Sequence, residues 1–306
     1  AGIPPLLQTG ALLLLVVFLL KAALLPLYFW LPAAYSSAAA PVAALFAIMT
    51  KIGVYAILRI FTLIFGADVA GPWLLPLALT TLALGAVGVL AARSLRLLVS
   101  YLVIVSMGTL LAGIGLFSAK GISAALYYLL HTTMVTACLY LLADVIARQR
   151  GAQADTLAAG TGVARPSLTG AAFFIAAITV AGMPPLSGFL GKLLILEAAL
   201  DSPPMPWLWA VLLGGSFLAI IALARAGSLL FWKTTGRAAQ GVPVRPLLAA
   251  LLPLTVSPLL VLFALPVQEY TAAATAQLLL PQGYIDAVLG HSAPSPVERA
   301  SLEEMP

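Results

Sequence analysis

The sequence predicts an all-α membrane protein that crosses the bilayer about eight times. Apolar residues make up 62% of the 306 residues and charged residues only 8%, and the mean hydropathy is +1.11. These values lie outside the range of soluble globular chains. The apolar residues form long runs, and a helix needs about 20 of them to cross the hydrocarbon core. Short loops separate the runs and hold most of the basic residues, as expected for a polytopic membrane protein.

Eight segments are long and apolar enough to span a membrane. Their predicted bounds, in chain order, are residues 9 to 31, 41 to 64, 72 to 92, 96 to 117, 121 to 147, 168 to 200, 206 to 232 and 246 to 266. The sixth is too long for one simple span, and the stretch AGMPPLSGFLGK interrupts it with prolines and glycines. Because proline removes a hydrogen-bond donor and blocks the helical ladder, we expect a broken helix there.

Four of these segments carry a residue that helices in a bilayer rarely contain. The first is the run LLLLVVFLLKAALLPLYFWLP around Lys21, and the second is APVAALFAIMTKIGVYAILRIF around Lys51. The fifth contains His131 in YYLLHTTMVTACLYLLADVI, and the broken sixth segment carries Lys192 just after its interruption. The lone Cys138 is expected to be a small buried hydrophobe, since no second cysteine exists for a disulfide.

The loop charges predict which side each loop faces. The loops after the third, fifth and seventh segments hold Arg93, Arg96, Arg148, Arg150, Arg165, Lys233, Arg237 and Arg245. The opposite side holds Lys120 and, in the tail, Arg299. By the positive-inside rule the first set faces the cytoplasm, so both ends of the chain are expected to be external.

Composition divides the chain into three expected regions and no soluble domain. Residues 1 to 266 form the transmembrane region, residues 267 to 290 form a short helix or two at the membrane interface, and residues 291 to 306 form a disordered tail. The first apolar run has neither a basic region before it nor a small-residue cleavage site, so we do not expect a signal peptide.

The buried lysines are the strongest functional signal in the sequence. A charged side chain at bilayer depth costs at least about 2.5 to 3.5 kcal/mol, so it is rare unless it faces a protein interior or water. Glu197 lies about 140° around the helix from Lys192, so it is not the obvious partner of that lysine. Asp144 and Asp201 fall near segment ends, which leaves more buried positive than negative charge. Either the lysines are neutral part of the time, or carboxylates come from outside this chain.

These residues suggest a proton relay. Burial disfavours the ammonium form, so a desolvated lysine can take up and release a proton near neutral pH. His131 is the other side chain whose charge can change in that range, and Thr132, Thr133 and Thr136 beside it could hold ordered water. Arg59 and Arg225, near their segment ends, are interpreted as structural residues whose side chains reach toward the interface.

Other kinds of chemistry lack the residues they need. The sequence has no phosphate-binding loop, no dinucleotide fingerprint and no HExxH motif, and its two histidines are not placed to bind a metal. No dense Lys/Arg cluster suggests nucleic-acid binding. We therefore expect no cofactor, no metal site and no enzyme activity in this chain.

Three stretches resemble a known family. They are KAALLPLYFWLP at residues 21 to 32, TKIGVYAILRIF at 50 to 61 and GMPPLSGFLGKLLIL, which begins at Gly182. They are similar to the antiporter-like subunits shared by respiratory NADH:quinone oxidoreductase and the Mrp (also Pha or Mnh) multisubunit cation/proton antiporters. Within that family, LYFWLPAAY, RAGSLLFWK and QGYIDAVLG resemble the D-type subunits of the Mrp antiporters. In quinone-reductase relatives a lysine often follows the histidine by four residues, and here Val135 stands there.

The resemblance implies a fold of fourteen transmembrane helices with two discontinuous helices, in which the eight segments correspond to helices 7 to 14. The first break would fall around Pro26 to Pro32. Lys21, Lys51 and Lys192 match relay lysines of the family, with His131 between the last two. The glutamate that pairs with the lysine matched by Lys21 would lie in the N-terminal half, which this sequence does not include.

Three hypotheses follow. The first is a subunit of a bacterial inner-membrane antiporter that exchanges protons for Na⁺ or K⁺, with other antiporter subunits and the lipid bilayer as its partners and no nucleic acid. The alternative within the family is a proton-pumping membrane subunit of a respiratory NADH:quinone oxidoreductase. A membrane scaffold with inert lysines is the third. The sequence alone does not identify the cation.

Overall fold

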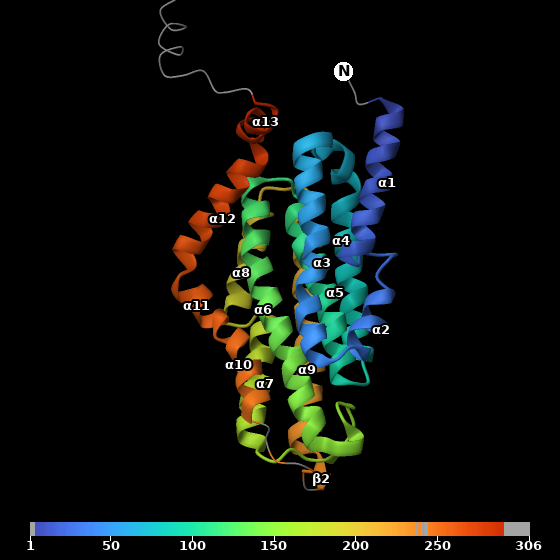
Figure 1. Ribbon diagram of the computed structural model, residues 1–306, viewed down its shortest axis with the longest axis vertical. Helices are drawn as coiled ribbons and strands as arrows, with labels where there is room; N and C mark the ends of the chain where they lie inside the picture. Colours follow the sequence, from blue (N-terminus) through green and yellow to red (C-terminus); the bar gives the residue numbers. More distant parts are fainter. Residues whose placement is uncertain (1–3, 237, 240, 242–243, 291–306) are drawn as a thin grey trace, which may run out of the picture.

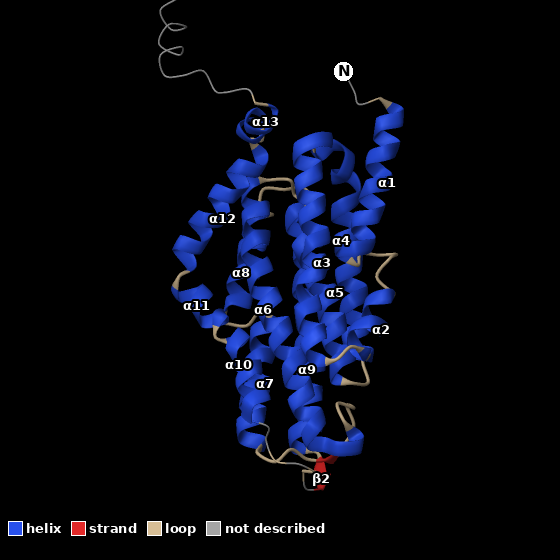
Figure 2. Ribbon diagram, in the orientation of Figure 1, coloured by secondary structure: helices blue, strands red, loops and turns tan. Residues whose placement is uncertain are grey.

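The computed structural model is a bundle of long helices that run roughly along one axis (Figure 1). It describes residues 4 to 236, 238, 239, 241 and 244 to 290. Within this part the strands are β1 (Gly160–Thr161) and β2 (Thr234–Gly236), which pair with each other at one end of the bundle (Figure 2). The predicted all-α class is confirmed. Arg237, Arg299 and the tail from 291 to 306 lie outside the described residues.

The helices match six of the eight predicted segments to within about five residues, and the first and last segments differ. They are α1 (Pro5–Ala22), α2 (Trp30–Ser37), α3 (Ala40–Ile60), α4 (Ala67–Ala91), α5 (Leu95–Ile114), α6 (Ala119–Arg150), α7 (Pro166–Ala181), α8 (Ser187–Ala198), α9 (Met205–Gly227), α10 (Val244–Leu254), α11 (Val256–Leu262), α12 (Ala264–Leu279) and α13 (Gln282–Leu289). A π-helical turn extends each of α3 and α9 by five residues. In the described part, 7 helical stretches are long and apolar enough to cross a membrane, and α7 is a shorter apolar helix. Together with α8 it supplies the eighth, broken crossing.

The predicted break in the sixth segment is present. Helix α7 ends at Ala181, and α8 begins at Ser187 after a loop that contains both prolines of the MPPL stretch. Gly182 ends α7 in a left-handed conformation (φ 84°), which a residue with a side chain rarely adopts. The chain therefore leaves the helix here and starts again within the bundle.

The first segment differs from the prediction of one span over residues 9 to 31. Helix α1 ends at Ala22 and α2 begins at Trp30, so Lys21 lies at the end of α1 and not near the middle of a helix. The break starts at Ala23, which has φ 55°, earlier than the prolines around which the family resemblance places it. Hydropathy did not predict this break, because the residues on both sides of it are equally apolar.

The last segment is also interrupted. The stretch predicted as one span over 246 to 266 consists of α10, α11 and the start of α12. Pro258 and Pro266 are the third residues of α11 and α12. Proline has no backbone N–H, so neither can bond the carbonyl four residues earlier, which belongs to the last residue of the preceding helix, and the helical ladder is interrupted at both places. Helix α12 crosses the expected boundary at residue 266, and α13 lies at the end of the bundle (Figure 1). The division into transmembrane and interfacial regions stays a prediction.

Helix α6 is the centre of the bundle. It packs against α3, α5, α7, α8, α10 and α12, and it therefore lies between the two halves of the described chain. In a bilayer, lipid competes with protein for apolar surface, so close packing and internal hydrogen bonds hold such helices together. The polar side chains in the middle of α6, His131, Thr132, Thr133 and Thr136, are accordingly buried against neighbouring helices.

The arginine-rich loops gather at one end of the bundle. Arg96, in the first turn of α5, lies 3.1 Å from Asp144, and Arg148 lies 2.7 Å from the same carboxylate. The start of α1 and α13 lie at the opposite end (Figure 1), as an even number of crossings requires.

Candidate functional site

Three of the four predicted relay residues meet in the interior of the bundle. Lys51 on α3, His131 on α6 and Lys192 on α8 are 2%, 2% and 7% exposed. Helix α6 packs against both α3 and α8, so His131 lies between the helices that carry the two lysines. That these residues form a proton relay stays a prediction.

Lys51 is buried without a bonded partner. Within the described residues its Nζ has no hydrogen-bond partner, and the same is true of Oγ1 of the neighbouring Thr50. A buried ammonium group without an acceptor is strongly disfavoured, so this position requires either water or a neutral amine. Both conditions allow the group to exchange a proton.

His131 has one ring nitrogen fixed and the other free of protein partners. Its Nδ1 lies 2.9 Å from Ser187 Oγ, which in turn lies 2.8 Å from Ser257 Oγ on α11. Its Nε2 has no partner among the described residues, and neither has Oγ1 of Thr132. Thr133, in contrast, donates to the carbonyl of Leu129 in its own helix. Ordered water beside Nε2 and Thr132 would satisfy both groups, in a polar site of the kind that holds buried water.

Lys192 is held by the break between α7 and α8. Its Nζ donates to the carbonyl of Ala181 at 2.8 Å and to Ser216 Oγ on α9 at 2.8 Å, with the carbonyl of Val180 at 3.4 Å. The last carbonyls of a helix have no partner within it, and they carry partial negative charge that favours a cation. The break thus supplies Lys192 with acceptors deep in the bundle.

Lys21 stands apart from this buried group. Its side chain is exposed on the surface of the described chain, at the end of α1 beside the first break. Its backbone nevertheless packs tightly on α3. A Cβ added to Gly53 would lie 2.7 Å from Ala22 N and 3.0 Å from the carbonyl carbon of Lys21, so only glycine allows this approach. Lys21 therefore lies next to the helix of Lys51 without being buried by this chain.

The described residues include no buried aspartate or glutamate. Asp144 pairs with Arg96 and Arg148 at the arginine-rich end, and Glu197 is exposed while Lys192 is buried. The excess of buried positive over buried negative charge inferred from the sequence is thus confirmed for this part of the chain. No group of three His, Cys, Asp or Glu side chains gathers there in a way that could hold a metal ion.

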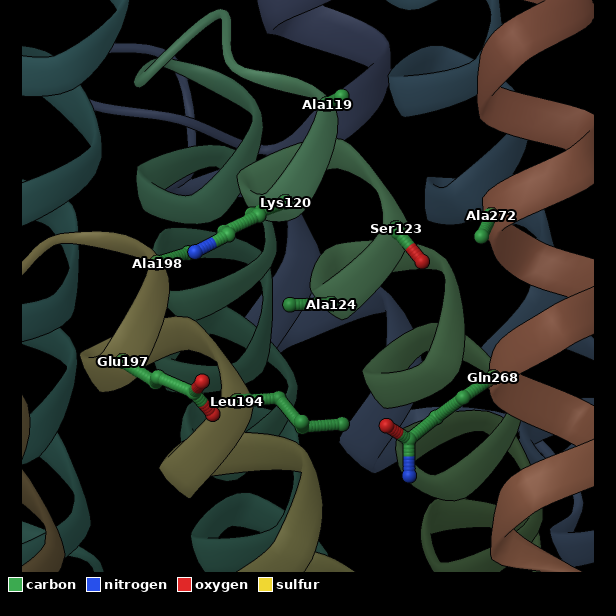
Figure 3. Close-up of a pocket in the computed structure, with 9 residues that line it drawn as sticks. All are labelled: Ala119, Lys120, Ser123, Ala124, Leu194, Glu197, Ala198, Gln268 and Ala272. Carbon is green, nitrogen blue, oxygen red and sulfur yellow. The ribbon is translucent and has the colours of Figure 1, made fainter.

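A cavity opens beside the helix of Lys192, at the end of the bundle opposite the arginines. It has a volume of about 300 Å³ and lies between α6, α8 and α12. Figure 3 shows Lys120 and Glu197 reaching toward it from α6 and α8, with Gln268 of α12 on its far side. Glu197 is five residues after Lys192, a rise of about 7.5 Å along the helix. The charged side chains at this opening thus lie about 7.5 Å along α8 from the level of the buried lysine.

The sequence did not identify the hydroxyl groups that hold the site. Ser187 contacts His131, Ser216 contacts Lys192, and Ser257 contacts Ser187. Each contact joins two helices and forms only after folding. The one available signal was Ser187 itself, inside the interrupting stretch AGMPPLSGFLGK. Serine is common in membrane helices, so nothing in the chain distinguishes Ser216 or Ser257.

Comparison with known families identifies relatives over most of the chain. The profile of the family described as "NADH:quinone oxidoreductase/Mrp antiporter, TM" matches residues 5 to 222. A Rhizobium meliloti protein, described as a probable D-type subunit of a K⁺/H⁺ antiporter, is 35% identical over 318 residues, covering 93% of this chain and 59% of the relative. The D-type subunit of the Na⁺/H⁺ antiporter of Bacillus subtilis is 36% identical, covering 92% of this chain and 59% of the relative.

A solved structure has the same arrangement of helices. A chain of the Mrp complex from Dietzia sp. superposes with a TM-score of 0.82 at 27% identity, covering 92% of this chain and 61% of that one. The present chain thus spans about three-fifths of the length of the relatives it matches.

Proposed function

The chain belongs to the family of membrane subunits shared by NADH:quinone oxidoreductases and Mrp antiporters, and from this membership we propose that it conducts protons as part of a multisubunit Na⁺/H⁺ or K⁺/H⁺ antiporter. Its partners are the other subunits of that complex. The two relatives named above are antiporters of different cations, so the proposal covers both Na⁺ and K⁺.

One observation carries the proposal. Lys51, His131 and Lys192 occupy three helices that pack through α6, and all three are buried in a part of the chain that buries no carboxylate. Ionisable groups inside a membrane protein mark ion and proton pathways far more often than they stabilise the fold. A row of bases without fixed counter-ions is suited to passing a proton along.

The contacts suggest how a proton moves along this row. A proton on Lys192 is stabilised by the carbonyl of Ala181 and by Ser216. His131 has Nε2 free to take or give a proton through water, while Ser187 fixes Nδ1. A charge on one member disfavours a charge on its neighbours, so each protonation biases the next. Repulsion between neighbouring protonated groups therefore moves the proton on to the next unprotonated member of the row.

Lys21 is the proposed inner end of the path, where a carboxylate from outside this chain pairs with it. Closing that pair would stabilise the ammonium form, and opening it would release the proton toward Lys51. The exposure of Lys21 beside the break leaves room for such a partner, and the tight contact at Gly53 holds the lysine next to α3.

The cavity beside α8 is the proposed outer end. Lys120 and Glu197 line it, and Glu197 follows Lys192 by little more than one turn of the same helix. Under the positive-inside rule this end faces the exterior of a bacterial cell membrane, and so do both ends of the chain.

The second candidate is a proton-pumping subunit of an NADH:quinone oxidoreductase, because the description of the matching family names both complexes. Val135 favours the antiporter, since quinone-reductase relatives often carry a lysine at that place. In either complex this chain would carry protons and perform no redox chemistry.

The test is cation-dependent proton transport in everted vesicles from antiporter-deficient cells that express the full-length parent with its partner subunits. Wild type is compared with Lys21→Ala, Lys192→Ala and the control Lys233→Ala, whose side chain is exposed at the arginine-rich end. We expect Lys21→Ala and Lys192→Ala to abolish Na⁺- or K⁺-induced proton movement in assembled complexes, and the control to retain it.

Two results would replace the proposal. Unchanged transport in both relay variants would favour a scaffold with inert lysines. A wild type without any cation response, together with co-purification of flavin and iron-sulfur subunits, would favour the oxidoreductase.

A further inference from the structure

A second cavity lies at the arginine-rich end of the bundle, far from the lysines and His131 along their helices. It has a volume of about 480 Å³, within the range of small-molecule sites. It is formed by the end of α4, the loop after α6 and the end of α9. Its lining residues are Leu90, Ala91, Ala92, Arg93, Thr156, Leu157, Ala158, Arg225 and Leu229.

The charged part of this lining is entirely basic. Arg93 and Arg225 line the cavity, and no carboxylate does. The acids nearby are engaged elsewhere, since Asp144 pairs with Arg96 and Arg148, and Asp155 accepts a hydrogen bond from the backbone of Arg96. The cavity consequently presents two positive charges that no described side chain neutralises.

The guanidinium group of Arg225 is held by two hydrogen bonds and has further N–H donors that are not used within the described residues. Its Nη2 donates to the carbonyls of Leu90 and Ala92 at 2.7 and 3.2 Å, at the end of α4. A guanidinium has five N–H donors, so the donors on Nε and Nη1 remain for another acceptor. Arg225 therefore bonds to the end of another helix, and the same residue lines the cavity.

Arg93 is held only by its backbone. Its carbonyl accepts from Leu157 N at 2.8 Å, which joins the end of α4 to the loop after α6. Within the described residues its side chain makes no hydrogen bond and is exposed. Two guanidinium groups, one fixed and one free to close, form a suitable receptor for a phosphate.

Apart from Thr156, the rest of the lining is apolar. It consists of Leu90, Leu157 and Leu229, together with three alanines. Trp232, three residues after Leu229, is 69% exposed, and exposed tryptophans are typical of the membrane–water interface. The cavity therefore lies where lipid headgroups lie, with a charged rim for a phosphate and an apolar wall for acyl chains.

We propose that this cavity binds an anionic phospholipid, with its phosphodiester between Arg93 and Arg225 and the start of its acyl chains against Leu90, Leu157 and Leu229. A free inorganic phosphate would share the arginine contacts and would make no use of the apolar wall. The inference does not depend on proton transport, because none of these residues belongs to the relay.

The experiment is lipid binding to the purified, delipidated complex, followed by native mass spectrometry. The probes are phosphatidylglycerol, phosphatidylcholine and inorganic phosphate. The main variant is Arg93→Gln, whose side chain holds no described contact, so the fold is expected to persist. Arg165→Gln is the matched control, because it removes the same charge from the same end of the bundle and does not line the cavity.

We expect phosphatidylglycerol to bind more tightly than phosphatidylcholine, and Arg93→Gln to weaken phosphatidylglycerol binding about fivefold while Arg165→Gln leaves it unchanged. A photoreactive phosphatidylglycerol should crosslink to the loop around Leu157 and to the end of α9. Equal binding of both lipids, or equal losses in the two variants, would overturn the proposal. Displacement of the lipid by inorganic phosphate at similar concentration would also overturn it in favour of a free-anion site.

Discussion

At the residue scale, the two ring nitrogens of His131 have different surroundings among the described residues. Ser187 Oγ lies 2.9 Å from Nδ1, and Ser257 Oγ lies 2.8 Å beyond it, so α8 and α11 together orient the ring. A hydrogen bond to one ring nitrogen fixes the orientation of an imidazole and hence the direction of the other nitrogen, as is common for functional histidines. Here the bond at Nδ1 fixes the direction of Nε2. The serines are thus positioning residues for the proposed relay.

Ser187→Ala should therefore lower both stability and transport. The change leaves His131 Nδ1 without its partner, while Ser257 Oγ loses the hydroxyl of Ser187 and keeps the backbone N–H of residue 187 as a donor. An unsatisfied buried polar atom costs about 1 to 3 kcal/mol. We expect a lower thermal midpoint of the assembled complex and a lower rate of proton transport. Ser257→Ala added to Ser187→Ala should cost less than the sum of the two single changes, because the two hydroxyls act as one unit. Additive effects would show that the pair is not coupled.

Glu197→Gln tests the outer cavity. Removing this carboxylate should slow proton release without disturbing the fold, because the residue is exposed and lines the opening beside α8. We expect transport to fall by about two- to tenfold, less than the loss of roughly 100-fold or more that removal of a proton-transferring group causes. Asp201→Asn is the control, since Asp201 is exposed nearby and does not line the cavity. Equal effects of the two changes would refute a specific role for Glu197.

The sequence correctly predicted that Lys51, His131 and Lys192 are buried, whereas Lys21, selected by the same pattern, is exposed in this chain. The contacts of the buried bases could not be predicted. Lys51 and Lys192 lie deep in apolar runs, and a charged side chain at such a depth is expected to face the protein interior because exposure to lipid is costly. The acceptors of Lys192 come from α7 and α9, and their approach depends on how α8 restarts after the break. Local sequence patterns do not specify such contacts between helices.

At the element scale, the two broken helices differ in how readily the sequence reveals them. The break before α8 follows from two adjacent prolines and Gly182, which physically end a helix. The break after α1 begins at Ala23, before any proline, inside a run of uniform hydropathy. Tertiary packing against α3 and α4 decides that position, so a pattern based on hydropathy alone extended the helix too far.

Gly53→Ala tests the contact between α1 and α3. The new Cβ would lie 2.7 Å from Ala22 N, so α1 must move away from α3 together with Lys21. We expect a loss of about 1 to 3 kcal/mol and reduced transport. Gly214→Ala is the matched control in another membrane helix, because nothing lies within 4 Å of its added Cβ. Similar behaviour of the two variants would contradict the close approach.

Arg150→Ala tests the loop that follows α6. Arg150 is 1% exposed and donates to the carbonyls of Thr161, Thr156 and Ala158 at 2.9, 2.6 and 2.8 Å. Its loss removes the charged donor of three loop carbonyls, so we expect destabilisation by about 1 to 3 kcal/mol and faster proteolysis of the loop. Arg148→Ala, which removes only a half-exposed ion pair with Asp144, should change stability by about 1 kcal/mol or less. Equal proteolysis of the two variants would argue against an anchoring role.

At the scale of the whole molecule, the bundle has two chemically different ends. Arg96, Arg148 and Arg150 lie at one end with the paired strands, and the starts of α1 and α6 lie at the other (Figure 1). The proposed path runs through α6 from the surface at Lys21 to the cavity beside α8. Its direction across the membrane follows from the distribution of loop charges.

Thiol labelling tests this orientation. Lys120→Cys and Lys233→Cys place a single exposed thiol at opposite ends, and the native Cys138 is buried and should not react. In intact spheroplasts, an impermeant maleimide should label Lys120→Cys directly and Lys233→Cys only after permeabilisation. The reverse pattern would invert the topology.

The central claim is that protons pass through the buried bases around α6, and the most direct measurement is proton flux in proteoliposomes that contain the purified complex. An imposed Na⁺ or K⁺ gradient should drive flux in wild type, and Lys51→Ala should reduce it about 100-fold or more with the complex intact. Lys233→Ala, which removes an exposed lysine, should leave the flux unchanged. Flux through Lys51→Ala at the rate of wild type would contradict the claim.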